Sequence, residues 1–395
     1  MPRRAVPADP SIGDRIRARR QLRGWSVRHA AGRAGISHTS WSRIERGQQR
    51  TDRYMVVDLA AALECSVVEL TGQPYVPADR QLDAARIDAE RVWLEMMRHP
   101  PTEPSSVTNQ HPAAVQRESN LVRDLYGRCD YAGAMHRLIG LIPALRLGEN
   151  RREAVPVYGV VMGCLLNVGF PAHAWLAAEQ CVAAAQRQDD PVGLAVAAAN
   201  QARVLSYTGA YGPARAACDR AADDLDRDLS APAALDLMGF LHLARAHHSA
   251  GLRDVAGAEA HLAEATRIAD RTGETDAWDM AWGPRNVALW QMALQLDTGR
   301  AGEAIETARG IRVADLPAVR QVYFYMDMAR ALADVARHHD AVRMLLAAER
   351  VGPQHTRSSA AARETARLLL RRGSAGSELR GLCERMGVIA ESSGA

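Results

Sequence analysis

A short pattern of small and apolar residues recurs along most of the chain. The pattern occupies positions i, i+4 and i+7, and its first member is Ala in each of six occurrences. The six triplets are Ala134-Leu138-Leu141, Ala174-Ala178-Cys181, Ala214-Cys218-Ala221, Ala258-Leu262-Ala265, Ala304-Ala308-Ile311 and Ala341-Leu345-Ala348. The lead residues are therefore 40, 40, 44, 46 and 37 positions apart. A unit of this length suits a helical hairpin whose apolar face must be covered by a neighbouring hairpin.

The rest of the sequence agrees with an all-α fold. Aromatic residues make up 5% of the chain, and strand-like alternation is almost absent. Glycines that can form turns precede four of the triplets: Gly169, Gly209, Gly251 and Gly299. The units resemble tetratricopeptide repeats with long helices, and two further helices near residues 365–395 would cap the array. We therefore expect an α-solenoid, with an unrelated helical bundle as the open alternative.

A different pattern occupies the N-terminal region. Ser26 can cap a first short helix, Gly35 can adopt positive φ in a turn, and Ser37 can cap a second helix. Trp41 and Ile44 would face inward on that second helix. Its outer face would then carry polar side chains that can enter a major groove, where Arg reads guanine and Ser or Thr reads several base edges. These residues are His38, Thr39, Ser42 and Arg43.

The segment from about Ser11 to Gly72 resembles the DNA-binding domains of the lambda-repressor/Cro type, the XRE family. The resemblance lies in Ile12-Gly13, Ile16, Arg19-Arg20, Ser26, Ala31, Gly35-Ile36-Ser37, Ile44-Glu45-Arg46-Gly47, Leu59-Ala60, Leu63, Val67 and Leu70. It implies five helices, at about residues 12–23, 26–34, 37–46, 53–63 and 66–71. Two residues depart from the family: Val27 replaces a frequent Gln, which puts one DNA contact in doubt, and Trp41 replaces an aliphatic core residue.

Charge supports a nucleic-acid partner. Residues 1–53 contain thirteen Arg and four acidic residues, a net charge of +9, whereas the whole chain carries +3. Such a basic end is the electrostatic footprint expected for phosphate binding. We expect Arg28, Arg46, Gln48 and Arg50 to hold phosphates. The open alternatives are a solvated basic tail and a vestigial helical domain.

Several function classes are excluded or disfavoured. The chain contains no Lys, which excludes a P-loop, a Schiff-base lysine and the usual kinase lysine. There is also no HExxH or GxSxG motif, so we expect neither an enzyme nor a cofactor. Six Cys lie far apart without a CxxC motif and indicate buried thiols in a reducing cytoplasm rather than a disulfide or metal site. Residues 154–178 carry no charged residue, but Gly169 and Pro171 interrupt them, which favours a buried helical hairpin over a membrane span.

The repeats suggest a binding groove. The first helix of each hairpin lines the concave face of such a solenoid, and equivalent positions of three repeats carry Arg203, Arg245 and Arg330. A row of guanidinium groups favours an anionic or carboxylate-bearing ligand. The residues expected near them are Asn167, Asn200, Tyr207, His248, Asn286, Trp290 and Asp327. The alternative is arginines that pair with acidic residues on a solvated face.

The segment from Trp278 to Met292 holds three Trp and two Met. We interpret it either as core between repeats or as an apolar pocket wall.

These observations predict three regions: a DNA-binding domain over 1–73, a linker with one helix over 74–112, and a repeat domain for sensing and dimerisation over 113–395. The combination resembles the RRNPP quorum-sensing regulators and the actinobacterial XRE regulators with repeat C-termini. The resemblance implies a cytoplasmic, nucleoid-associated transcription regulator that binds a palindromic DNA operator as a homodimer. Its ligand would be a peptide or a small anionic molecule. The alternative is a repeat scaffold that recruits a partner protein to DNA.

Overall fold

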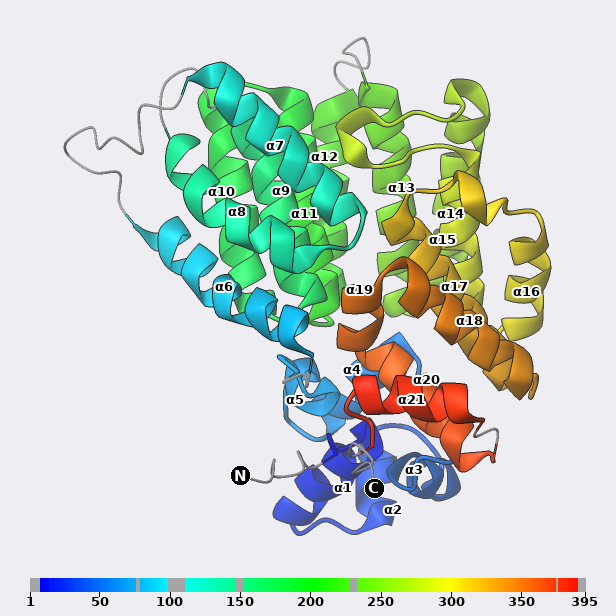
Figure 1. Cartoon of the computed structure of the whole chain (residues 1–395). Coiled ribbons are helices and arrows are strands. Elements are labelled where there is room, and N and C mark those ends of the chain that lie inside the picture. The colour runs from blue at the N-terminus through cyan, green and yellow to red at the C-terminus, as the bar shows by residue number, and fades with distance from the viewer. Residues whose placement is uncertain are drawn as a thin grey trace, which may run out of the picture. The chain divides into compact units, whose positions relative to one another are not determined.

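The computed structural model describes residues 8–75, 79–98, 111–146, 152–226, 233–373 and 376–389. In these ranges the regular structure is helical, apart from one isolated bridge between Thr275 and Trp282 (Figure 1). The expected all-α fold is therefore confirmed. Residues 1–7 of the N-terminal arm and most of the proline-rich segment 99–112 lie outside the described residues.

The five N-terminal helices begin at side chains suited to capping. The helices are α1 (Ile12–Leu22), α2 (Val27–Arg33), α3 (His38–Glu45), α4 (Arg53–Ala62) and α5 (Val67–Thr71). Each is preceded by a Ser or Asp whose side chain accepts a backbone N–H of the first turn: Ser11, Ser26, Ser37, Asp52 and Ser66. Because capping is local in sequence, the predicted starts agree with these starts within one residue.

Paired helices follow α6 (Arg80–Met97). The members of four pairs pack against each other: α7 (Pro112–Gly127) with α8 (Tyr131–Ala144), α9 (Ala154–Asn167) with α10 (Pro171–Gln188), α11 (Pro191–Tyr207) with α12 (Tyr211–Asp226), and α13 (Ala234–Gly251) with α14 (Val255–Thr272). They are followed by α15 (Pro284–Asp297), α16 (Ala301–Arg309), α17 (Ala318–Asp334) and α18 (His338–Val351). The chain continues through the short η2 (Ala277–Asp279) and η3 (Val313–Asp315) and ends with α19 (Pro353–Ser358), α20 (Ala360–Arg371) and α21 (Ser377–Arg385). The lead alanines of the six predicted triplets are all buried, and they lie on α8, α10, α12, α14, α16 and α18.

Three of the four expected turn glycines have positive φ, at Gly169, Gly209 and Gly299. Gly251 also precedes its triplet, but it is not among the glycines with positive φ. It ends α13, and a Cβ atom on it would lie 2.5 Å from the ring of Tyr211. The left-handed residue of that turn is Arg253, with φ of 64°. Gly251 is thus needed for close packing of α13 on Tyr211.

The chain divides into two compact units. One comprises Met1–Asp83, Gln295–Glu306 and Val322–Ala395, and the other comprises Ala84–Leu294 and Thr307–Gln321. The first unit joins the five N-terminal helices to helices from the end of the chain, which a contiguous division of the sequence does not anticipate. The boundaries expected at residues 73 and 112 stay predictions.

The uncharged segment 154–178 forms all of α9, a turn, and the start of α10, as the sequence predicted. None of the described helices combines the length and the apolar character that a membrane crossing requires.

Candidate DNA-binding surface and repeat groove

The helices α2 and α3 enclose a tight turn. Ser26 accepts the N–H of His29 at 3.1 Å, and Ser37 accepts the N–H of Ser40 at 3.0 Å. Gly35, between the two helices, has φ of +67°. Buried Trp41 packs in the same cluster as Ala30 and Ala31, small residues that let the two helices approach. The turn and the core therefore fix how α3 presents its outer face.

Glu45 at the end of α3 holds the motif to α1. Its carboxylate accepts two hydrogen bonds from Arg20, at 2.6 and 3.0 Å, and one from the indole N–H of Trp41, at 2.6 Å. Glu45 is 5% exposed. Burial alone would raise its pKa, but the bonds from Arg20 and Trp41 outweigh burial and hold the pKa below its usual range. From the sequence, Arg20 and Glu45 were identified only as positions of the family resemblance and Trp41 only as a core residue, and their hydrogen-bonded network was not predicted.

The outer face of α3 is accessible. His38, Thr39 and Arg43 are exposed, and Ser42 is half-buried. These four residues were expected to read bases. They lie on one short helix. Among the described residues of the first unit, none covers His38, Thr39 or Arg43.

Arginines around this face differ in their partners. Arg28, Arg43 and Arg46 are exposed, and none of them forms an ion pair within the described part of the chain. Arg46 donates only to the backbone oxygen of Ser42 at 3.1 Å. Gln48 is also exposed. By contrast, Arg23 and Arg33 both pair with the carboxylate of Glu64, at 2.5 and 2.9 Å.

Arg50 was expected to hold phosphate, but in this structure its guanidinium group is engaged. Its side chain is 9% exposed and donates to Asp334 at 2.6 Å, within the first unit. Burial lowers the pKa of Arg50, the charge of Arg330 adds to that effect, and Asp334 opposes it. Arg50 could reach a phosphate only after leaving Asp334.

Arg330 and Asp327 were expected in a ligand groove, and the structure places them in a buried ion-pair cluster instead. Arg330 donates to Asp297 at 2.5 Å and to Asp327 at 2.7 Å. Arg53 of α4 lies 3.6 Å from the same Asp297. The two carboxylates raise the pKa of Arg330 against the effect of burial. All four residues belong to the first unit.

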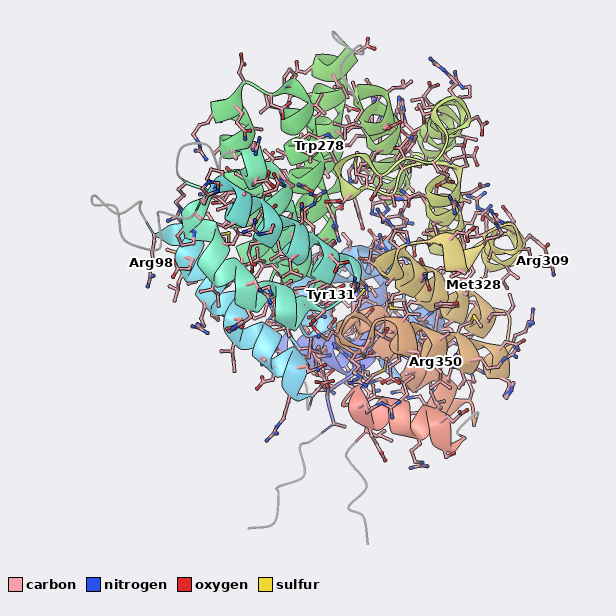
Figure 2. All side chains as sticks on the ribbon, turned by 45° about the horizontal axis from the view of Figure 1, so that its top comes forward. Arg98, Tyr131, Trp278, Arg309, Met328 and Arg350 are labelled. Atoms are coloured by element: carbon pink, nitrogen blue, oxygen red, sulfur yellow. The ribbon has the colours of Figure 1, made fainter. Side chains whose placement is uncertain are left out.

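In the second unit, α7, α9, α11 and α13 pack in succession, and two expected groove residues come together on them. Asn167 donates to the hydroxyl of Tyr131 at 2.9 Å, and Arg203 donates to the hydroxyl of Tyr126 at 3.4 Å. The rings of Tyr126 and Tyr131 lie 6.0 Å apart. Figure 2 labels Tyr131, which starts α8. Tyr126 was not predicted as a groove residue, since its role depends on contact with a helix 77 residues away.

The other expected groove residues have separate surroundings. Asn200 donates to the sulfur of Cys181 at 3.7 Å, and Tyr207 is 37% exposed. Arg245 lies 2.7 Å from Asp219, as the alternative of paired arginines anticipated. His248 is 2% exposed, and burial lowers its pKa to about 4.

The tryptophan-rich segment divides between core and surface. Trp282 is fully buried, whereas Trp278 and Trp290 are partly buried against the same apolar cluster. Trp290 stacks edge-to-face with Phe240 at 6.0 Å. Asn286 is 1% exposed and donates to the backbone oxygen of Met280 at 3.4 Å. Trp282 is therefore a core residue, as one of the two interpretations proposed.

No group of three or more His, Cys, Asp or Glu residues that could hold a metal ion occurs among the described residues.

Comparison with solved structures gives distant similarities. PlcR of Bacillus thuringiensis, in complex with the peptide PapR7 and DNA, is 13% identical with a TM-score of 0.33, over 72% of this chain and 99% of that chain. Aspartyl phosphate phosphatase F from Bacillus subtilis is 12% identical with a TM-score of 0.43, over 88% and 96%. The apo form of the competence regulator ComR from Streptococcus vestibularis is 13% identical with a TM-score of 0.24, over 80% and 98%.

Among curated proteins no sequence matches the chain. The N-terminal region matches a family model described as a helix-turn-helix domain, over residues 11–71. The chain therefore carries a helix-turn-helix domain at its N-terminus.

Proposed function

We propose that this protein is a sequence-specific DNA-binding transcription regulator in the cytoplasm. The observation that carries the proposal is the exposed outer face of α3, where Arg43 has no carboxylate partner in the described chain. Arg28, Arg43 and Arg46 are all exposed, and no ion pair within the described part of the chain offsets their charges, so all three remain available to the phosphates and bases of DNA. Base reading by an exposed second helix is how helix-turn-helix domains recognise the major groove.

The proposed contacts follow from this exposure. His38, Thr39, Ser42 and Arg43 read bases, and Arg28, Arg46 and Gln48 hold phosphates. Arg50 can bind a phosphate only after its ion pair with Asp334 breaks.

In vitro selection from a randomised duplex library tests this function. Because one module covers a half-site, the proposal expects enrichment of a palindrome that the full-length protein binds at least about a thousandfold more tightly than random duplex. No enrichment, at a salt concentration where random duplex is still bound, would contradict it.

We also propose that the protein acts as a homodimer. Supporting this, three apolar side chains at helical spacing on α6 are exposed: Ile87 at 59%, Leu94 at 49% and Met97 at 53%. An apolar stripe of this kind is typical of an association surface. If these apolar side chains of α6 bind a different protein instead of a second copy, the chain is a scaffold that recruits that partner to DNA.

The repeats of the second unit are proposed to bind an anionic ligand, either a peptide or a small molecule. The support is the pair of Asn167 and Arg203 beside Tyr126 and Tyr131. Arg330 and Asp327 are not proposed as ligand-binding residues, because they form an ion pair with each other.

Native mass spectrometry of protein purified from its own host tests both the dimer and the ligand. The expected spectrum is a dimer with an added ligand mass that Arg203→Ala removes and the exposed control Arg312→Ala retains. A dimer that survives Ile87→Glu with Leu94→Glu would remove α6 from the interface, and a co-purified protein would favour the scaffold.

A further inference from the structure

One ion pair joins parts of the repeat region that are far apart in sequence. Arg123 on α7 donates from Nε and Nη2 to the two carboxylate oxygens of Asp279, at 2.5 and 2.6 Å, across 156 residues. Asp279 lies in the connection between α14 and α15. Since α7, α9, α11 and α13 pack one after another, this bond joins the first helix of the series to the segment that follows the hairpin of α13 and α14. Both residues belong to the second unit.

The base of this connection is firmly anchored. The N–H of Thr275 donates to the backbone oxygen of Trp282 at 2.8 Å, and the Thr275 hydroxyl donates to Asp236 of α13 at 2.8 Å. Trp282 is fully buried, and its indole donates to Thr272 at 2.9 Å. The two ends of the connection are therefore fixed to α13 and α14, which limits any movement to the residues between Thr275 and Trp282.

The tip of the connection is strained. Trp278, Asp279 and Ala281 have φ of 57°, 54° and 47°, a left-handed region that residues with a Cβ atom rarely adopt. Such outliers persist only where surrounding contacts enforce them, and they concentrate at clamps and switches. Beneath the tip, Asn286 is 1% exposed, and its side-chain oxygen has no hydrogen-bond partner within the described residues. A buried, unsatisfied oxygen adds to the cost of this conformation.

The contact at the tip adjoins the proposed ligand residues. Arg123 and Tyr126 are three residues apart on α7 and therefore share a face. Tyr126 in turn accepts from Arg203. The side chain of Trp278, labelled in Figure 2, packs against the cluster formed by α11, α12 and α13. Arg123, at 29% exposure, and Asp279, at 43%, keep partial access to solvent, so their bond can open.

We propose that the residues between Thr275 and Trp282 form a strap that closes over the proposed ligand site at Tyr126 and Arg203, with the Arg123–Asp279 pair as its latch. Opening the latch relieves the left-handed tip and exposes Tyr126 and Arg203 together with the freed guanidinium of Arg123. The strap thus regulates access to the ligand groove, and in that respect it rests on the proposed function.

Hydrogen exchange of the full-length protein, without DNA or ligand, tests the latch. Asp279→Asn and Arg123→Gln should each speed exchange of the amides from Asp276 to Ala281 by about tenfold or more. The reversed pair, Arg123→Asp with Asp279→Arg, should restore exchange to within about threefold of the original protein. Arg128→Gln is the matched control, because Arg128 is also on α7 but pairs with Asp124 of the same helix at 3.0 Å.

Hydroxyl-radical oxidation of Tyr126 tests whether the strap covers the groove. Oxidation of Tyr126 should rise at least about twofold in the two single variants. In the variant with the reversed pair it should return to the level of the original protein. Unchanged exchange, or faster exchange without greater oxidation of Tyr126, would overturn the proposal. Faster exchange that extends through α9 and α10 would also overturn it, because the pair would then hold the fold rather than a strap. Since neither measurement involves DNA, failure of the strap leaves the DNA-binding proposal intact.

Discussion

The guanidinium group of Arg330 lies 2.5 Å from the carboxylate of Asp297, and the two side chains are 6% and 1% exposed. Asp327 holds a second side of the same guanidinium at 2.7 Å. Arg53, from the N-terminal helices, approaches Asp297 at 3.6 Å. This cluster therefore joins α4 to α15 and α17 inside the first unit.

Removing one charge from this cluster should destabilise the unit. Asp297→Asn leaves Arg330 buried with one carboxylate fewer, and breaking a buried pair from one side costs about 3–5 kcal/mol. Urea denaturation of the full-length protein should show this loss in the transition that includes α17. The control Asp340→Asn, at a solvent-exposed pair with Arg337, should leave that transition where it is. Equal effects of the two variants would show that the Asp297 cluster contributes nothing special.

The network around Glu45 should make the N-terminal domain sensitive to acid. The pKa of Glu45 is depressed in the folded protein, so its contribution is present above the unfolded value of about 4.5 and is lost as the pH falls through the folded value. Glu45→Gln should therefore lower the free energy of unfolding by about 3 kcal/mol at pH 7.

The difference in the free energy of unfolding between Glu45→Gln and the original protein should shrink as the pH falls below 4.5, because Glu45 of the unfolded chain takes up a proton there before Glu45 of the folded protein does. Urea denaturation at a series of pH values measures it. The control is Glu64→Gln, because Glu64 pairs with Arg23 and Arg33 but is 47% exposed. If the difference in the free energy of unfolding stays constant across this pH range, the charge of Glu45 does not cause the destabilisation.

Local features of the fold could be predicted from the sequence. Ser26 and Ser37 precede helices because their side chains satisfy backbone donors two or three residues away, and this needs no knowledge of the tertiary structure. The hairpin repeat was predictable for a similar reason, since a buried Ala such as Ala174 recurs with its own helix pair. Both signals lie within a few residues of the elements that they define.

Pairings between distant residues could not be predicted in this way. Arg50 and Asp334 are 284 residues apart, and Arg123 and Asp279 are 156 apart. An arginine on a helix has the same sequence pattern whether it faces solvent, DNA or a buried carboxylate. The row of groove arginines therefore resolved into different surroundings, with Arg330 in a buried cluster, Arg245 beside Asp219 and Arg203 at Tyr126.

This difference in surroundings separates the arginines in a ligand test. In host cells carrying an operator-driven reporter, Arg203→Ala should abolish the response to the ligand, because its guanidinium lies with Tyr126 and Asn167 in the proposed groove. Adding Arg245→Ala should cause little further loss. Both variants should keep the DNA affinity of the original protein in vitro. Full induction in the double variant would refute an anion site at this place.

The phosphate contacts and the base contacts should separate by their salt dependence. Arg46→Ala should weaken binding to every duplex to a similar extent and reduce the slope of log affinity against log salt by about 1. Fluorescence anisotropy over a range of salt concentrations measures the slope. A loss confined to one base position would instead make Arg46 a base contact.

The most direct measurement is the affinity of Arg43→Ala for the selected operator and for each single-base variant of its half-site. If α3 reads bases, the variant should lose about 1–3 kcal/mol on the operator and lose discrimination at one base position while keeping it at the others. Exposed Arg312→Ala should bind every duplex as the original protein does. A uniform loss on all duplexes, or no loss, would contradict base reading by α3.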